Sequence, residues 1–161
     1  MQRSIIVGVM GGGSVSDQVR SDAYSLGALI AKQGWILLNG GRDAGVMAAS
    51  ALGAHEAGGV TIGILPDSTS QSANAYIHIP IVTGMGNARN CINVLSSDVV
   101  VACPGGMGTL SEIVLALKCQ KPTLLLNYKT NPQFEPYQIS GLLKYVQSPQ
   151  EAIEQIQALF L

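Results

Sequence analysis

Three glycine clusters are the residues of this sequence that are best suited to chemistry. Each cluster follows a short apolar run. The clusters are Gly11-Gly12-Gly13-Ser14, Gly40-Gly41-Arg42-Asp43-Ala44-Gly45 and Pro104-Gly105-Gly106-Met107-Gly108-Thr109. Glycine lets the backbone approach a ligand closely, and the free amides at the start of a following helix favour phosphate. A tight turn from strand to helix also needs glycine, so one cluster alone is equally consistent with turn geometry. Three clusters together favour a nucleotide-like ligand.

Several common classes of site are disfavoured. No Gly-Lys-Ser or Gly-Lys-Thr follows the glycines, and Gly11 to Ser14 lacks the spacing of the dinucleotide fingerprint, so we expect neither ATP hydrolysis nor NAD binding. His55 and His78 are far apart in the sequence and neither has a second histidine at ligand spacing. We therefore expect structural histidines and no protein-ligated metal. Cys91 and Cys103 have no nearby histidine to activate them, which predicts buried packing residues.

The strongest constellation joins Gly84-Met85-Gly86-Asn87-Ala88-Arg89-Asn90 to Pro104-Gly105-Gly106-Met107-Gly108-Thr109-Leu110-Ser111-Glu112. The second string resembles the Pro-Gly-Gly-x-Gly-Thr-x-x-Glu signature of the Lonely Guy phosphoribohydrolases, long labelled lysine decarboxylases. It equally resembles the molybdenum cofactor carrier proteins, which share their Rossmann-like fold. The resemblance runs from Val7 to about Leu126. It includes the second glycine cluster through Met47, and Arg89 falls at the helix arginine of the superfamily.

The resemblance implies a phosphate site. The Gly105 to Thr109 loop would present backbone amides and the Thr109 hydroxyl to the phosphate, and Arg89 would add a bidentate contact. In the enzymes the glutamate that corresponds to Glu112 faces the ribose and stabilises the charge that develops as the N-glycosidic bond breaks. Thr109-Leu110-Ser111-Glu112 is also a capping box, in which Glu112 returns to the Thr109 amide. Both interpretations of Glu112 are open at this point.

The predicted ligand-binding residues come from the glycine clusters and from the segment around Arg89. They are Gly12, Gly13, Ser14, Gly41, Arg42, Met85, Arg89, Asn90, Pro104, Gly105, Gly106, Met107, Gly108, Thr109 and Glu112. Arg42 either approaches the anion or caps its own helix turn, and Asn39 is a further loop donor. Arg89 and Glu112 would be catalytic only in a hydrolase.

The residue after Arg89 separates the members of the superfamily. The phosphoribohydrolases typically carry Arg-Lys there, whereas this chain has Arg89-Asn90 and therefore lacks one charge near the phosphate. This pattern resembles the carriers and favours a protein that binds, protects and carries molybdenum cofactor, with the molybdopterin phosphate at the Gly105 to Thr109 loop. The alternative is a nucleoside 5'-monophosphate phosphoribohydrolase of the cytokinin-activating type. A nucleotide-sensing module that acts on a partner is the third hypothesis.

Alternating strands and helices must position these residues. Apolar runs predict strands, buried on both faces, at Ser4 to Met10, Trp35 to Leu38, Val60 to Leu65, His78 to Val82, Val99 to Cys103 and Thr123 to Asn127. Helical spacing predicts helices at Asp17 to Gln33, Ala44 to Ala57, Asn87 to Ser97 and Thr109 to Gln120, and a capping box at Ser148-Pro149-Gln150-Glu151 opens a last helix to Phe160.

This alternation predicts a mostly parallel sheet with helices on both faces and a ligand beyond the carboxyl ends of the strands. With the resemblance, it indicates a single Rossmann-like α/β domain over residues 1–161 that binds a nucleotide or cofactor. The polar segment Asp67 to Ala75 is expected to be a mobile flap. Tyr128 to Tyr137 is expected to be an ordered loop ahead of a short helix.

Composition limits the partners. Charged residues make up 12% of the 161, about half of the roughly 25% typical of soluble domains, so much of the surface must be uncharged. This predicts a homodimer or homotetramer. The net charge of -1 gives no basic field for nucleic acid or a membrane surface. The expected partners are a small phosphorylated ligand and proteins that donate or accept the cofactor.

The cysteines and the N-terminus indicate the compartment. Three cysteines without Cys-x-x-Cys spacing favour reduced thiols. The N-terminus does not resemble a signal peptide, and no apolar run approaches the ~18 residues of a membrane span. We expect a cytoplasmic protein.

Overall fold

Strand β1 (Ile6–Met10) occupies the centre of a seven-stranded sheet in the computed structural model, which describes residues 3–160. The strand order is β4-β3-β2-β1-β5-β6-β7, and all neighbouring strands pair in parallel. The other strands are β2 (Ile36–Asn39), β3 (Thr61–Leu65), β4 (Ile79–Val82), β5 (Val99–Ala102), β6 (Thr123–Leu126) and β7 (Leu143–Val146). The chain moves outward from β1 to β4 and then returns to β5 on the other side of β1. This reversal opens a crevice at the carboxyl ends of β1 and β5.

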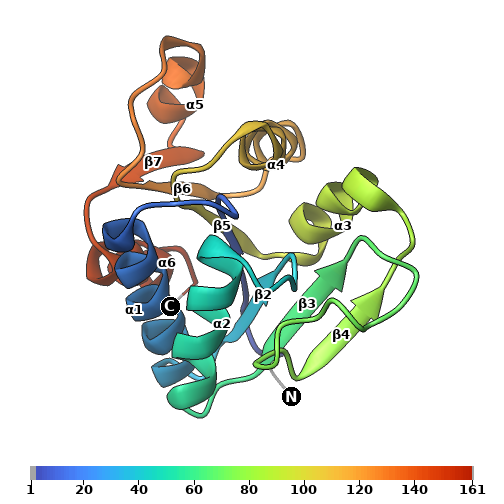
Figure 1. Ribbon diagram of the computed structural model, residues 1–161. Coiled ribbons are helices and arrows are strands. Elements are labelled where there is room, and N and C mark those ends of the chain that lie inside the picture. The colour runs from blue at the N-terminus through green and yellow to red at the C-terminus, as the bar shows by residue number, and fades with distance from the viewer. Residues whose placement is uncertain (1–2, 161) are drawn as a thin grey trace.

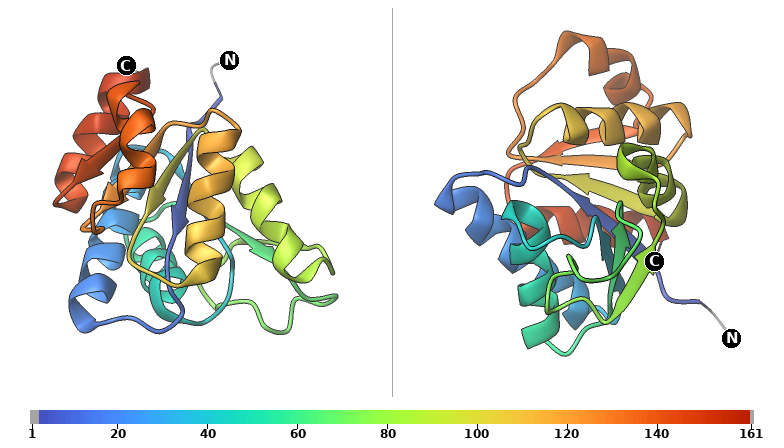
Figure 2. Two further views of the ribbon diagram at one scale, coloured as in Figure 1. Left: turned by 90° about the horizontal axis from the view of Figure 1, so that it is seen from above. Right: turned by 45° about the vertical axis from the view of Figure 1, so that its right-hand side comes forward.

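Helices cover both faces of the sheet (Figures 1 and 2). Helices α1 (Asp17–Lys32), α2 (Gly45–Glu56) and α6 (Pro149–Phe160) pack on one face, and α3 (Arg89–Ser96) and α4 (Met107–Lys118) pack on the other. Each face buries its own apolar core, because the β-branched and leucine side chains of the central strands alternate between the two faces. The structure thus confirms a Rossmann-like α/β domain with helices on both faces of a parallel sheet.

Two strands differ from the sequence-based prediction. Strand β7 was not predicted, because it is only four residues long and Lys144 interrupts its apolar pattern. Strand β4 was predicted to be buried on both faces, which is wrong, since Ile79, Ile81 and Val82 are all more than 40% exposed. The reason is its place at the sheet edge, where the connection from β3 is a loop and provides no covering helix.

The helix termini bear on the site. Helix α4 begins at Met107, two residues before the predicted start at Thr109. The capping box that opens α6 is present, because the Glu151 amide donates to Ser148 Oγ at 3.1 Å, although the Glu151 carboxylate accepts from the Gln147 amide. The predicted loop from Tyr128 to Tyr137 contains a short 3-10 helix (Pro132–Phe134) and the first three residues of α5 (Glu135–Ile139), so the short helix begins earlier than predicted.

The segment from Asp67 to Ala75 is attached to the loop after β2. Asp67 accepts hydrogen bonds from Arg42 at 2.9 Å and from Ser72 at 2.5 Å. Asn74 donates to the Gly41 carbonyl oxygen and to the Asp43 carboxylate. These contacts tie both ends of the segment to one loop, so it is not the free flap that its composition suggested.

The cysteines occupy different environments. Cys103 is fully buried at the end of β5, as predicted, whereas Cys91 and Cys119 are exposed. The prediction that Cys91 packs in the interior is therefore wrong, because its side chain lines an open hollow between α3 and α4. Among residues 3–160, no helix is both long and apolar enough to cross a bilayer.

Candidate functional site

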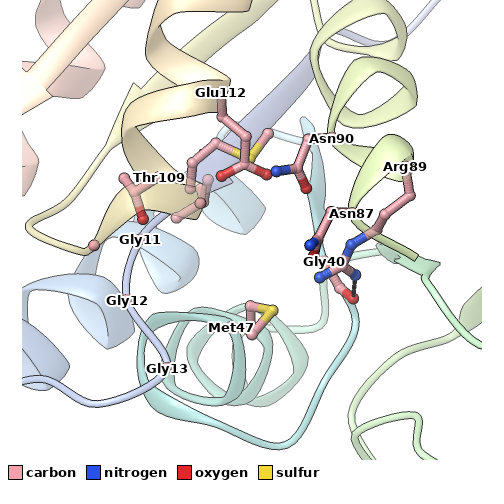
Figure 3. A pocket seen from close by; sticks show the side chains of 14 residues that line it. Gly11, Gly12, Gly13, Gly40, Met47, Asn87, Arg89, Asn90, Thr109 and Glu112 are labelled. Atoms are coloured by element: carbon pink, nitrogen blue, oxygen red, sulfur yellow. Dashed lines mark hydrogen bonds between the residues drawn. The ribbon is translucent and has the colours of Figure 1, made fainter. Parts of the chain in front are cut away.

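A cavity of about 280 Å³ lies at the carboxyl ends of β1, β2 and β5, at the point where the strand order reverses (Figure 3). Its lining consists of Val9, Met10, Gly11, Gly12, Gly13, Gly40, Met47, Asn87, Arg89, Asn90, Gly106, Gly108, Thr109 and Glu112. Ligands of doubly wound sheets bind at this crevice. The cavity therefore coincides with the place where the sequence predicted a ligand.

The N-terminus of α4 forms one wall of the cavity. The amides of the first turn of a helix have no acceptor within the helix. Gly106, which precedes α4, has no side chain that could cap them, so these amides are free. A Cβ atom added to Gly106 or to Gly108 would meet no neighbouring atom within 4 Å, so the space beside both residues is open. Free amides and the positive end of a helix dipole are favourable for an anion.

Gly105 supports the site from behind. A Cβ atom there would lie 2.2 Å from Thr109 Oγ1 and 2.6 Å from the Gly12 amide nitrogen, so only glycine fits. The Gly12 amide donates to the Pro104 carbonyl oxygen at 3.1 Å. Pro104 and Gly105 thereby hold the loops after β1 and β5 together.

Arg89 is the cation of the cavity. It is the first residue of α3, and its Nη1 donates to the main-chain carbonyl oxygens of Gly40 and Ile64, which fixes the guanidinium at the ends of β2 and β3. Its Nε and Nη2 have no hydrogen-bond partner within the described part of the chain. Burial lowers the pKa of Arg89 from its ordinary value, but a guanidinium stays protonated in proteins.

Glu112 faces the cavity from α4, and only 8% of it is exposed. Its Oε1 accepts a hydrogen bond of 2.8 Å from Asn93 Nδ2. Burial raises the pKa of Glu112 to about 7, although the Asn93 bond and the positive charge of Arg89 both lower it. The capping-box interpretation is wrong, because α4 begins at Met107 and the Glu112 carboxyl bonds to Asn93.

Eight of the predicted ligand residues line this cavity: Gly12, Gly13, Arg89, Asn90, Gly106, Gly108, Thr109 and Glu112. The remaining predicted residues, Ser14, Gly41, Arg42, Met85, Pro104, Gly105 and Met107, do not line it. Arg42 forms an exposed ion pair with Asp67, and Met107 is 79% exposed and lines a neighbouring hollow between α3 and α4.

Asn39 is also not a ligand donor. It is completely buried, and its amide nitrogen donates to the Met47 carbonyl oxygen at 3.0 Å and to Ser50 Oγ at 3.1 Å. Its Oδ1 accepts from the Gly41 amide at 2.8 Å. Asn39 therefore shapes the loop after β2 from within.

The prediction missed Gly11, Gly40, Met47 and Asn87, together with Val9 and Met10 at the end of β1. Gly11, Gly40 and Asn87 lie inside the motifs that the sequence singled out, although they were not among the predicted residues. Met47 reaches the cavity because it lies in the first turn of α2, next to Gly40.

Other reactive side chains lie outside the cavity. The rings of His55 and His78 are 5.4 Å apart, a proximity that their separation in the sequence did not predict. Within residues 3–160, no three His, Cys, Asp or Glu side chains gather as a metal site. Burial raises the pKa of Cys103 to about 12, which makes its thiol a poor nucleophile.

The chain is similar to one protein family and to several solved structures. The model of the SLOG cluster4 family matches residues 4–153. The molybdenum cofactor binding protein from the phototrophic bacterium Rippkaea orientalis is 47% identical and superposes with a TM-score of 0.94 over 100% of both chains. The molybdenum cofactor carrier protein from Chlamydomonas reinhardtii is 43% identical over 98% of each chain, with a TM-score of 0.87.

Two curated sequences add to this comparison. An uncharacterised protein from Archaeoglobus fulgidus is 41% identical over 91% of each chain. A cytokinin riboside 5'-monophosphate phosphoribohydrolase from Mycobacterium tuberculosis is 37% identical over 56% of this chain, and the match spans half of that enzyme's length.

Proposed function

This chain belongs to the SLOG cluster4 family and to the molybdenum cofactor carrier proteins, and on this basis we propose that it binds, protects and carries molybdenum cofactor. The observation that carries the proposal is the cavity at the strand reversal. There the free amides of α4 and the guanidinium of Arg89 line one space, in a chain that matches two such proteins over nearly its whole length.

The phosphate of molybdopterin would bind at the N-terminus of α4. The amides of Gly106, Gly108 and Thr109 and the Thr109 hydroxyl provide donors, and Arg89 adds a positive charge that is already fixed by two carbonyl oxygens. Because the guanidinium is held before the ligand arrives, little side-chain entropy is lost on binding.

The pterin would lie along the neutral part of the lining. Asn87 and Asn90 provide amide donors and acceptors that suit a polar heterocycle, and Met47 provides an apolar contact. A second hollow of about 610 Å³ between α3 and α4 shares Asn87, Asn90 and Gly108 with the cavity. The cargo can therefore extend beyond the 280 Å³ of the cavity itself.

The hydrolase alternative has one observation in its favour. Arg89 and Glu112, which the resemblance assigns to catalysis in the phosphoribohydrolases, both line the cavity. An N-glycosidic bond breaks through an oxocarbenium-like state that an ionised carboxylate stabilises. Burial of Glu112 works against this role because it favours the neutral acid.

A paired assay on one preparation tests the two functions. Base release is measured from a panel of nucleoside 5'-monophosphates, beside saturable binding of molybdenum cofactor and its protection against air oxidation. We expect tight, protective binding without base release. Base release that disappears in Glu112→Gln would instead identify a phosphoribohydrolase.

We further propose that the carrier works as a homodimer or homotetramer in the cytoplasm and exchanges its cargo with donor and acceptor proteins. Unpaired cysteines, two of them exposed, favour a reducing compartment. The exposed apolar side chains of Leu95 on α3 and Val114 on α4 favour self-association.

A further inference from the structure

Asn93 carries a buried acceptor without a donor. The residue is completely buried on α3, its Nδ2 donates to Glu112, and its main-chain oxygen accepts from Ser97 Oγ. Its side-chain Oδ1 has no partner, and it is alone in this respect among the buried side-chain N and O atoms of the described residues. A buried acceptor is costly unless it receives a hydrogen bond.

A proton on Glu112 provides the missing donor. A carboxylic acid and a primary amide pair through two hydrogen bonds, one in each direction, and Asn93 Nδ2 already makes one of them by donating to Glu112 Oε1. A neutral carboxylic acid has an O–H donor, whereas a carboxylate only accepts. The neutral acid therefore suits both the burial of Glu112 and the unpaired oxygen of Asn93.

The charges around the cavity lead to the same protonation state. Arg89 and Glu112 are the only ionisable residues in its lining, so an ionised Glu112 would cancel the cation. The end of β1 and the Gly11 to Gly13 loop contribute no ionisable group, and α2 contributes only Met47. Beyond Arg89 lie Arg42 and Asp67, whose opposite charges form a pair.

We propose that Glu112 is a neutral carboxylic acid, held by Asn93, when the cavity takes its ligand, and that this leaves one net positive charge which selects ligands with a dianionic, phosphate-like group. Asn93 is then a positioning residue and Glu112 a specificity-determining one. The proposal rests on the proposed function for the identity of the ligand.

The proposal makes anion binding depend on pH in one direction. Below the pKa of Glu112, which is about 7, the acid is neutral and the cavity is cationic. Above it, a carboxylate faces the bound anion and weakens binding. The cavity should therefore bind dianions more weakly at alkaline pH.

Infrared spectroscopy detects the protonation state without any ligand. The carbonyl stretch of a protonated carboxyl group is expected in the wild-type protein at about pH 6, disappearing as the pH rises past about 7, and absent in Glu112→Gln. Glu154→Gln, at an exposed site on α6, is the matched control and keeps the band. In Asn93→Leu the band should move to higher frequency, because the carbonyl oxygen of Glu112 loses the hydrogen bond that Asn93 donates to it.

Sulfate is the probe for binding, since its double negative charge is constant over this pH range. Wild type and Glu154→Gln should bind sulfate about tenfold more weakly at about pH 8 than at about pH 6, while Glu112→Gln shows no such loss. Absence of the band at about pH 6, or the same pH dependence in wild type and Glu112→Gln, would overturn the proposal. A protein that meets both expectations but does not bind molybdenum cofactor would keep this inference and lose the proposed function.

Discussion

Gly105 and Gly106 are neighbours with opposite surroundings. A Cβ atom at Gly105 would collide with Thr109 and Gly12, whereas a Cβ at Gly106 would meet no protein atom within 4 Å and would take up space that we propose for the ligand. Gly106→Ala should reduce affinity for the cofactor at least about tenfold, while costing at most about 1 kcal/mol of stability as a less favourable N-cap.

Gly105→Ala is the matched comparison. It should lower the free energy of unfolding by about 1–3 kcal/mol, because the backbone of two loops must move apart. Isothermal calorimetry and urea unfolding of both variants check the pair. Unchanged cofactor affinity in Gly106→Ala would place the ligand elsewhere.

Glu112 links the site to stability. Its pKa of about 7 in the folded protein exceeds its ordinary value of 4.5, so the folded protein binds this proton more tightly than the unfolded chain. The stabilisation is complete below about pH 4.5 and is lost as the pH rises through about 7, by about 3 kcal/mol for a shift of this size. Urea unfolding from about pH 4 to about pH 8 should show this fall in wild type and not in Glu112→Gln. Parallel curves for the two proteins would mean that Glu112 is ionised in the fold.

At the residue level, Arg89 and Glu112 were predicted from the sequence as ligand residues and both line the cavity, whereas Arg42, which was also predicted, does not line it. Arg89 belongs to a motif whose helix position aims it at the strand ends. Arg42 lies within a glycine cluster too, but its partner Asp67 comes from a distant loop, which no local pattern reveals. The pairing of Asn93 with Glu112 joins two helices and was equally hidden.

At the scale of elements, Asn39 connects the end of β2 to the first turns of α2. Asn39→Ala would leave the Gly41 amide without its buried acceptor and would also remove the hydrogen bonds that Asn39 donates to the Met47 carbonyl oxygen and to Ser50 Oγ. We expect a loss of about 2–4 kcal/mol in the free energy of unfolding. Asn87→Ala, at an exposed position of the cavity, should change stability by less than about 0.5 kcal/mol. Equal unfolding midpoints for the two variants in urea would contradict this account of the loop.

Strongly periodic elements were predictable, and edge elements were not. The alternation of apolar runs with helical spacing located β1, β2, β5 and the helices between them, because burial on both sides leaves a continuous apolar run. Strand β7 lies at the edge of the sheet opposite β4. Lys144 interrupts its apolar run, so the sequence did not predict this strand. Helix α4 starts before Thr109 because Gly106 can precede a helix without a polar cap.

At the scale of the whole molecule, apolar side chains are exposed on α3 and α4, the two helices beside the cavity. Leu95 on α3 and Val114 on α4 are 54% and 49% exposed. Since burial of such a surface favours association, we expect a dimer through this face. Light scattering at micromolar concentration should give two or four times the chain mass.

Leu95→Asp tests which face associates. It should shift the protein toward the monomer, because a charge would be buried in the contact. Ile139→Asp, on α5 and 80% exposed, is the matched control and should stay dimeric. A wild-type monomer, or equal effects of the two substitutions, would refute association through α3 and α4.

The most direct test of the account is retention of molybdenum cofactor under anaerobic gel filtration, followed by the amount that survives exposure to air. Wild type should co-elute with the cofactor and slow its oxidation, whereas Gly106→Ala, folded to the same extent, should elute without it. Loss of the cofactor from wild type, or its equal retention by Gly106→Ala, would contradict the claim that the cavity at α4 carries it.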